Sequence, residues 1–232
     1  MVQITGETPL GVCGVGVDTV ADRRLEVLAN TGNGTYAVVD DESEARKAMA
    51  DSAFGNLVTV AKDAKLQVFF DPQAVASWRL LGYEDRHLAR SEFSDDGIDA
   101  GEIGAGHQIT ALYAVVPVAG DESNSFTTAD ERSAAASPVP GTLLRARLRW
   151  QPPTSGASLL IECDLGGAPQ AMDDDFRFAS AVACAGLLLT RSPARGDCTW
   201  DLAHALAVAG RGADSDGLRG EFIALVDRER KR

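Results

Sequence analysis

The sequence lacks the features that mark several functional classes. It has no run near the roughly 18 consecutive apolar residues that a membrane-spanning helix needs. Its first residues, Met1 to Thr5, form neither the basic nor the apolar region of a signal peptide. Basic residues are also few, since 22 Lys and Arg stand against 34 Asp and Glu, giving a formal net charge of −12. Phosphate backbones and anionic lipids require clustered cations, so we expect no nucleic-acid partner. Because no long apolar run occurs, we also expect no membrane span in this chain.

Cysteine is scarce as well. The four cysteines include no Cys-x-x-Cys pair, and no histidine lies at ligand spacing from them, which argues against structural zinc. Cys13 and Cys184 lie in apolar runs, and we expect both to be small buried side chains. For an exported protein, the sequence leaves two disulfide pairings open, Cys163–Cys198 and Cys184–Cys198.

The beginning of the chain predicts two successive strand–helix units. Residues 9–17 form a short apolar run, typical of a parallel strand covered on both faces. A helix capped by Asp18 or Thr19 and a second apolar strand over residues 35–39 follow this run. Asp41, with Glu44 three residues later, then opens a second helix. Two such units predict a parallel sheet with right-handed crossovers.

The middle of the chain predicts β-structure, because apolar residues there often alternate with polar ones. We expect a charged, glycine-bearing loop over residues 94–106, and strands over residues 66–70, 75–81, 107–118, 143–150 and 158–163. Residues 120–141 are small, polar and proline-ended, so they cannot bury enough apolar surface to offset the entropy of ordering. We therefore expect a mobile insertion there, between paired strands.

The last part of the chain predicts three helices. Asp173 or Asp174 caps the first helix, Thr199 caps the second over residues 200–209, and Ser215 or Asp216 opens the third near Leu218. On the first helix we expect one apolar face formed by Phe176, Ala179, Val182, Ala183, Gly186 and Leu187.

A dinucleotide site is one candidate for chemistry. Gly14 and Gly16 lie between a strand and a helix, and Asp40 closes the next strand where a ribose-binding acid belongs. However, the third glycine position holds Thr19, and the chain supplies no second nucleotide-binding half. A nucleotide-binding enzyme using Gly14, Gly16 and Asp40 is therefore the alternative interpretation and not the preferred one.

The remaining polar patterns predict structural roles. Three arginines alternate along one strand, which indicates a solvated face that balances the acidic surface, and acids at Asp173–Asp175 suit a helix N-terminus. Neither a Gly-x-Ser-x-Gly nor a His-Glu-x-x-His motif occurs, and the acids near residue 96 lack the spacing of an EF-hand. We expect no catalytic, cofactor-binding or metal-binding residue. The residues considered for such roles are Arg145, Arg147, Arg149, the scattered His87, His107 and His204, and the acids Asp95, Asp96, Asp99 and Glu102.

Several long stretches resemble bacterial YfbK-type proteins, which carry a von Willebrand factor A (vWA) domain. Residues 28–36 and 41–47 resemble the last strand and helix of that vWA domain. The similarity continues into the YfbK C-terminal domain, a domain of unknown function, through residues 60–68, 79–86, 99–113 and 174–182.

This resemblance implies an α+β fold in two parts. Residues 1–58 would be a partial α/β unit, vWA-like and Rossmann-like, and residues 59–232 a β-rich, sandwich-like domain with C-terminal helices. Family members are often associated with the cell envelope, which implies an extracytoplasmic location. vWA domains bind a divalent cation through an Asp-x-Ser-x-Ser motif and two further loops, and this sequence contains none of these stretches. We therefore expect no metal ligand, and either a fragment of a longer protein or a naturally truncated gene.

These observations predict a non-enzymatic protein-interaction module, of the adhesion or scaffolding type, whose protein partner is unknown. A further interpretation is a structural domain that only presents the metal-binding half of a vWA domain. Two strands leave a vWA sheet incomplete, so an unpaired edge near Gly11–Val17 predicts self-association. Strands of the β-rich domain, or an N-terminal segment supplied in trans, are the other ways to complete that sheet.

Added metal ions and nucleotides test these expectations. We expect millimolar Mg²⁺, Mn²⁺ or Ca²⁺, and likewise NAD or ATP, to leave the melting temperature unchanged in thermal unfolding. A ligand present at 100 times its dissociation constant would raise the free energy of unfolding by about 2.7 kcal/mol. A saturable rise with a cation would contradict the expected absence of a metal site, and a rise with NAD or ATP would support the nucleotide alternative.

Overall fold

The computed structural model describes residues 11–15, 22–32, 36–42, 44–46, 48, 58–82, 90–97, 100–118, 141–166 and 170–232. Gly16, the helix cap at Asp18 or Thr19, and most of the expected insertion over residues 120–141 lie outside these described residues. The described residues form both helices and strands, which confirms the predicted α+β class.

The chain divides into two compact units. Unit 1 comprises Met1–Gln67, Leu88–Gln108 and Ala146–Cys163, and unit 2 comprises Val68–His87, Ile109–Arg145 and Asp164–Arg232. Both units combine segments that are far apart in the sequence. The expected division into residues 1–58 and 59–232, and the vWA-like character of the first part, stay predictions.

Unit 1 begins with the expected strand–helix–strand arrangement. Strands β1 (Val12–Val15) and β2 (Tyr36–Val39) flank helix α1 (Asp22–Thr31) in the sequence and pair in parallel, with Gly14 opposite Val38. The Asp41 carboxylate accepts a hydrogen bond from the Glu44 N–H at 2.9 Å, as expected for a helix cap. The prediction for Cys13 was wrong, because Gly14 faces the covered side of this sheet and Cys13 lies exposed on the other face.

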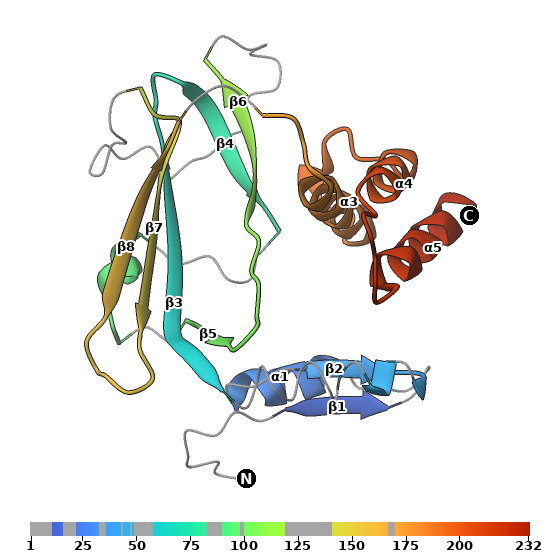
Figure 1. Ribbon diagram of the computed structural model, residues 1–232, viewed down its shortest axis with the longest axis horizontal. Coiled ribbons are helices and arrows are strands. Elements are labelled where there is room, and N and C mark those ends of the chain that lie inside the picture. Colours follow the sequence, from blue (N-terminus) through green and yellow to red (C-terminus); the bar gives the residue numbers. More distant parts are fainter. Residues whose placement is uncertain are drawn as a thin grey trace. The chain divides into compact units, whose positions relative to one another are not determined.

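The middle of the sequence contributes a four-stranded sheet, in the order β5 (Gly101–Gly104), β3 (Thr59–Phe70), β7 (Leu144–Gln151) and β8 (Leu159–Leu165). Figure 1 shows the long strands β3, β7 and β8 running beside one another. The expected loop over residues 94–106 is wrong in part, because it contains β5, antiparallel to β3, and the end of the 3-10 helix η2 (Arg90–Ser94). Glycines at both ends of β5 conceal its strand character in the sequence.

Unit 2 contains a further sheet, the second with two strands. Strands β4 (Val75–Leu81) and β6 (Leu112–Pro117) pair antiparallel. The strand expected over residues 107–118 therefore begins at Leu112, later than predicted. Phe70, Trp78 and Tyr113 form an aromatic cluster with ring centroids 5.1 to 5.7 Å apart. Tilted and edge-on pairs of this kind add to the stability that burial alone supplies.

Three helices complete unit 2: α3 (Asp174–Leu189), α4 (Trp200–Ala209) and α5 (Leu218–Arg230), with the 3-10 helix η5 (Pro193–Arg195) after α3. Asp173 caps α3 by accepting the Phe176 N–H at 2.7 Å, and Thr199 caps α4 by accepting the Leu202 N–H at 3.1 Å. Both caps are as predicted.

Helix α5 begins at Leu218 as predicted, but the expected cap at Ser215 or Asp216 was wrong. Gly217 is the N-cap, with a left-handed backbone (φ 74°) that glycine adopts readily. The Asp214 carboxylate accepts the N–H groups of Arg219 and Gly220, both at 2.9 Å. An acid three residues before the N-cap therefore supplies the capping acceptors.

Helix α3 packs mainly through small side chains, which corrects the face expected for it except at Leu187. Phe176 and Val182 are exposed, whereas the buried residues of this helix are Ala181, Cys184, Ala185 and Leu187. Ala203 and Ala207 of α4 are fully buried, and Figure 1 shows α3 and α4 packed against each other. Small side chains allow the two backbones to approach closely, and this contact decides which face is inside.

We expect Gly210→Ala to destabilise the protein by about 1–3 kcal/mol, because a well-packed contact resists added atoms. A Cβ on Gly210 would lie 2.5 Å from the Phe178 backbone nitrogen and 2.6 Å from the Asp174 carbonyl oxygen in α3. Urea unfolding followed by circular dichroism measures the change.

Gly186→Ala is the matched control for this prediction. Gly186 lies in α3, and a Cβ added to it would meet no heavy atom within 4 Å, so alanine should stabilise the helix by roughly 0.5–1 kcal/mol. Equal stability of wild type and Gly210→Ala would contradict the close approach of α3 to the end of α4.

Candidate functional site

The arginines of β7 lie on one face of the four-stranded sheet, and each has a carboxylate partner. Arg145 lies 2.8 Å from Asp164, and Arg147 lies 2.6 Å from Glu162. Arg149 is paired at 2.8 Å with Asp96, which follows η2. The alternation of these arginines therefore balances acidic residues, as predicted, and their charge is compensated within the fold.

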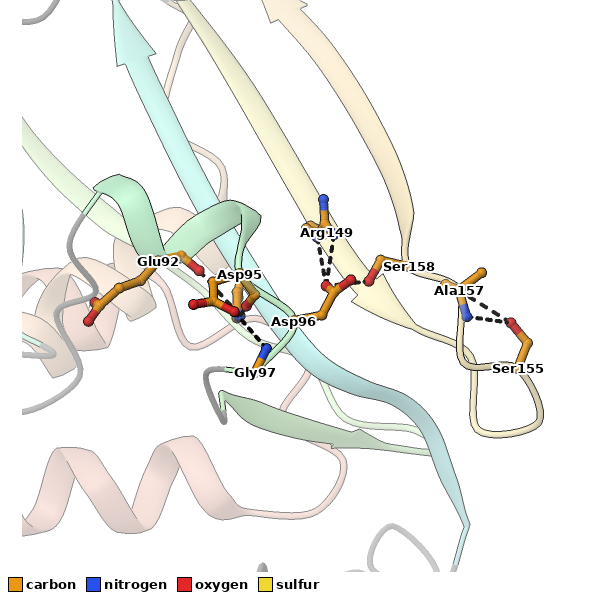
Figure 2. Close-up of polar contacts among 9 residues, drawn as sticks. Glu92, Asp95, Asp96, Gly97, Arg149, Ser155, Ala157 and Ser158 are labelled. Carbon is orange, nitrogen blue, oxygen red and sulfur yellow. Dashed lines mark hydrogen bonds and ion pairs between the residues drawn. The ribbon is translucent and has the colours of Figure 1, made fainter.

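Asp96 receives hydrogen bonds from Arg149 of β7 and from Ser158, which directly precedes β8 (Figure 2). The hydroxyl of Ser158 donates to its carboxylate at 2.6 Å, and Arg149 donates through Nε at 3.2 Å and Nη2 at 2.8 Å. The hydrogen bond from Ser158, followed by that from Arg149, lowers the pKa of the Asp96 carboxyl below its ordinary value. Asp96 is therefore a carboxylate at neutral pH and joins the segment after η2 to the β7–β8 hairpin.

Lys65 of β3 also binds the η2 segment, through hydrogen bonds to its backbone. Its side chain is buried, with 2% of its surface exposed, and Nζ donates to the carbonyl oxygens of Glu92 and Asp95. A cation at the last carbonyls of a helix is favoured by the helix dipole, and these bonds satisfy a buried ammonium group.

An aromatic contact and a turn complete this arrangement. Phe93 of η2 is buried beneath the guanidinium of Arg147, 5.3 Å from its ring centroid, at a distance that suits a cation–π contact. Asp95 accepts the Gly97 N–H at 2.8 Å and so closes a tight turn. We call this set of contacts the η2 clamp; its members are Lys65, Phe93, Asp96, Arg147, Arg149 and Ser158.

The opposite face of the same sheet is apolar. Side chains alternate between faces along a strand. Because Arg147 faces Glu162 and Lys65 faces η2, their strand neighbours Leu66, Leu148 and Ile161 lie on the other side. With Leu159 they form what we call the apolar sheet face, across the neighbouring strands β3, β7 and β8. These four side chains are between 37% and 56% exposed.

Strand β8 forms one edge of that face. It ends the strand order in the part of the sheet that the structure describes, and all seven of its residues are exposed. An edge strand offers a row of backbone N–H and C=O groups to a further strand. Glu162 and Asp164 of β8 are already paired with β7 arginines, so an incoming strand meets compensated charges there.

The residues of the dinucleotide alternative do not form a phosphate loop in the described part of β1 and β2. Gly14 lies within β1, opposite Val38, whereas a phosphate-binding glycine belongs in the turn after the strand. Gly16 lies outside the described residues, and Asp40 is exposed just after β2. The nucleotide-binding interpretation is therefore not favoured.

Other polar candidates have structural partners. Among the acids at the start of α3, Asp173 caps the helix, Asp174 pairs with Arg177 at 3.1 Å, and Asp175 pairs with Arg219. His204 lies 3.9 Å from Asp227. Within the described ranges, no three or more His, Cys, Asp or Glu side chains are grouped so that they could hold a metal ion. The helices described also include none with the length and hydropathy needed to cross a membrane.

The residues of the η2 clamp were missed as a group by sequence reasoning. Lys65 is one of two lysines in β3, and nothing in the sequence distinguishes it from Lys62. Asp95-Asp96-Gly97 is a turn signal whose long-range partners the sequence does not reveal. The alternation of the arginines was visible, but Asp96 lies 53 residues before Arg149.

The fold and this surface define an α+β protein with a clamped 3-10 helix on one sheet face and an exposed apolar face opposite. The chain belongs to the YfbK C-terminal family, whose model, described as "Uncharacterized protein YfbK, C-terminal", matches residues 55–231. It is 34% identical over 220 residues to "Uncharacterized protein YfbK" of Escherichia coli (strain K12). That alignment covers 94% of this chain and 38% of the relative. No solved structure matches the chain.

The pH dependence of stability tests the charge of Asp96. Its pKa is lower in the folded protein than its ordinary value near 3.8, so its carboxylate stabilises the fold above that pH. This stabilisation is lost as the pH falls through the lowered pKa. We expect Asp96→Asn to lower the urea midpoint at pH 7, and the gap from wild type to close as the pH falls below 3.8.

Glu42→Gln is the control for this measurement. Glu42 forms an exposed pair with Arg46 at 2.7 Å, and pairs of this kind contribute little. The urea midpoint of this variant should match wild type at every pH. A gap for Asp96→Asn that stays constant down to pH 2.5, roughly one unit below the ordinary pKa, would show that the ionised state of Asp96 does not stabilise the clamp.

Proposed function

We propose that this chain is a non-enzymatic protein-interaction module, of the adhesion or scaffolding type, which docks a partner on β8 and the apolar sheet face. The observation that carries this proposal is the contiguous exposure of Leu66, Leu148, Leu159 and Ile161 over three neighbouring strands. Contiguous apolar patches are uncommon on monomers and often mark interaction sites. The edge of β8 adds backbone groups that a partner strand can pair with.

The expected strength of such docking follows from the area available. Complete burial of a large apolar side chain contributes about 1.5–3 kcal/mol, so covering one that is already half-buried contributes roughly 1 kcal/mol. Association itself costs at least about 4 kcal/mol in lost translational and rotational freedom. The apolar face therefore needs the main-chain hydrogen bonds of β8 as well, and we expect binding in the micromolar range.

The chemistry of the polar face supports a non-enzymatic role. The cations of the η2 clamp are held in structural contacts: Lys65 donates to backbone carbonyls, Arg149 donates to Asp96, and Arg147 forms an ion pair with Glu162. Asp96 is stabilised in its charged form by Ser158 and Arg149, which makes it a weaker base than an ordinary carboxylate. These groups lock a segment in place and are not arranged for proton transfer.

A second copy of this chain is the partner we propose. An antiparallel pair of β8 strands is self-complementary about a two-fold axis, so the same strand supplies both halves of the contact. The compensated charges of Glu162 and Asp164 reduce the repulsion that such a pair would otherwise meet. Exposed Val15 in β1 offers the other route, the incomplete sheet edge anticipated from the sequence.

Light scattering after gel filtration tests this function. At about 100 µM, above a micromolar dissociation constant, the wild-type chain should be a dimer. Ile161→Lys should give a folded monomer, because it puts a charge in the middle of the apolar sheet face. Leu189→Lys is the matched control, since Leu189 is exposed on α3 in unit 2, and it should remain dimeric.

Val15→Lys separates the two routes of self-association. Monomers with Val15→Lys and dimers with Ile161→Lys would place the contact at the β1–β2 pair and reject the β8 surface. A wild-type chain that stays monomeric at this concentration would contradict self-association altogether.

A further inference from the structure

Two cysteines meet in the helical part of unit 2. Cys184 lies in the buried face of α3, and Cys198 lies just before the Thr199 cap of α4 and packs against the cluster that contains Cys184. The Cys184 thiol is 3.8 Å from the Thr199 carbonyl oxygen, to which it donates, and the Cys198 side chain is close enough to affect its pKa. Both thiols are free in this structure.

We propose that Cys184 and Cys198 are the site of a disulfide bond, which forms when the chain folds in contact with a disulfide oxidant. The bond would join α3 to the start of α4. This inference is independent of the proposed interaction surface, whose four apolar side chains lie in unit 1.

The backbone around both cysteines holds them in position. Thr190 and Ser192 donate their N–H groups to Gly186 and Leu187, which fixes the end of α3. The Cys198 N–H donates to the Arg195 carbonyl at 3.0 Å, and Thr199 caps α4 directly afterwards. A disulfide demands specific placement of both backbones. Here the turn between the helices and the cap of α4 supply it before any bond forms.

The two cysteines differ in accessibility, which orders the reaction. Cys198 is partly exposed and Cys184 is buried. With glutathione disulfide as oxidant, the Cys198 thiolate attacks one sulfur, forms a mixed disulfide and releases one glutathione thiolate. The Cys184 thiolate then attacks the Cys198 sulfur and releases the second. The two protein thiols lose two protons and two electrons in total, and glutathione disulfide is reduced to two glutathione molecules.

Burial makes the second step slow in the folded protein. Desolvation, together with the interaction with Cys198, raises the pKa of the Cys184 thiol to about 12. The thiolate is the attacking species, so the native thiol reacts slowly near neutral pH. The bond therefore forms most readily during folding, while α3 is still accessible, and the packed helices then protect it from reduction.

Refolding in a glutathione redox buffer tests the proposal. Reduced, denatured full-length protein is refolded, its remaining thiols are blocked, and it is digested with trypsin without reduction. We expect mass spectrometry to find the peptide of residues 178–191 linked to that of residues 196–211, as the dominant cross-link. The closed loop of about 15 residues should also raise the melting temperature, by roughly 10 °C relative to the same sample after dithiothreitol.

Single substitutions provide the controls. Cys198→Ser should lose both the cross-link and the shift in melting temperature, whereas Cys13→Ser and Cys163→Ser should keep both, since those two cysteines are exposed in unit 1. Oxidation in 6 M guanidinium, above the unfolding range of ordinary domains, supplies the distribution of pairings without structure. The proposal is overturned if refolded protein shows that same distribution, a dominant bond to Cys13 or Cys163, or only mixed disulfides with glutathione.

Discussion

The ammonium group of Lys65 is the constraint around which the four-stranded sheet is arranged. A buried cation on a β-strand is tolerated only when acceptors surround it, and here the carbonyl oxygens of Glu92 and Asp95 provide them. The 3-10 helix must therefore lie on that face of β3. Once it is there, Phe93 meets Arg147, and Asp96 meets Arg149 and Ser158. One face of the sheet is thereby covered by a polar segment, and the apolar side chains are left on the other.

This division explains why two surfaces with opposite character can share three strands. Alternation places arginines and carboxylates on one side of β7 and β8 and aliphatic residues on the other, so the same strands present a charged face and an apolar face. The paired charges fix the register of the hairpin, because a shift of one residue would move Arg147 away from Glu162 and onto the aliphatic face. A rigid register in turn keeps Leu159 and Ile161 presented side by side.

Sequence reasoning was most successful where the chemistry is local. Thr199 and Asp173 were recognised as helix caps because a cap involves neighbouring residues only. Sequence reasoning failed where contacts between distant segments determine which residues are buried or paired. The buried face of α3 follows from its contact with the alanines of α4, and neither helix shows this by itself. The carboxylate that pairs with Arg149 lies 53 residues earlier in the chain, with β5 and β6 between them, so the alternating arginines could be seen but not their partners.

The pairing of the β7 arginines also affects how fast molecules meet. These three cations are already neutralised by acids of the same fold, so they project little positive field into solution, while the chain as a whole carries a formal charge of −12. Two copies therefore repel one another on approach, over a Debye length of about 10 Å at 0.1 M salt. Added salt should raise the rate of encounter between copies and lower it for a basic partner. Ionic strength thus sets which kind of partner reaches the sheet first.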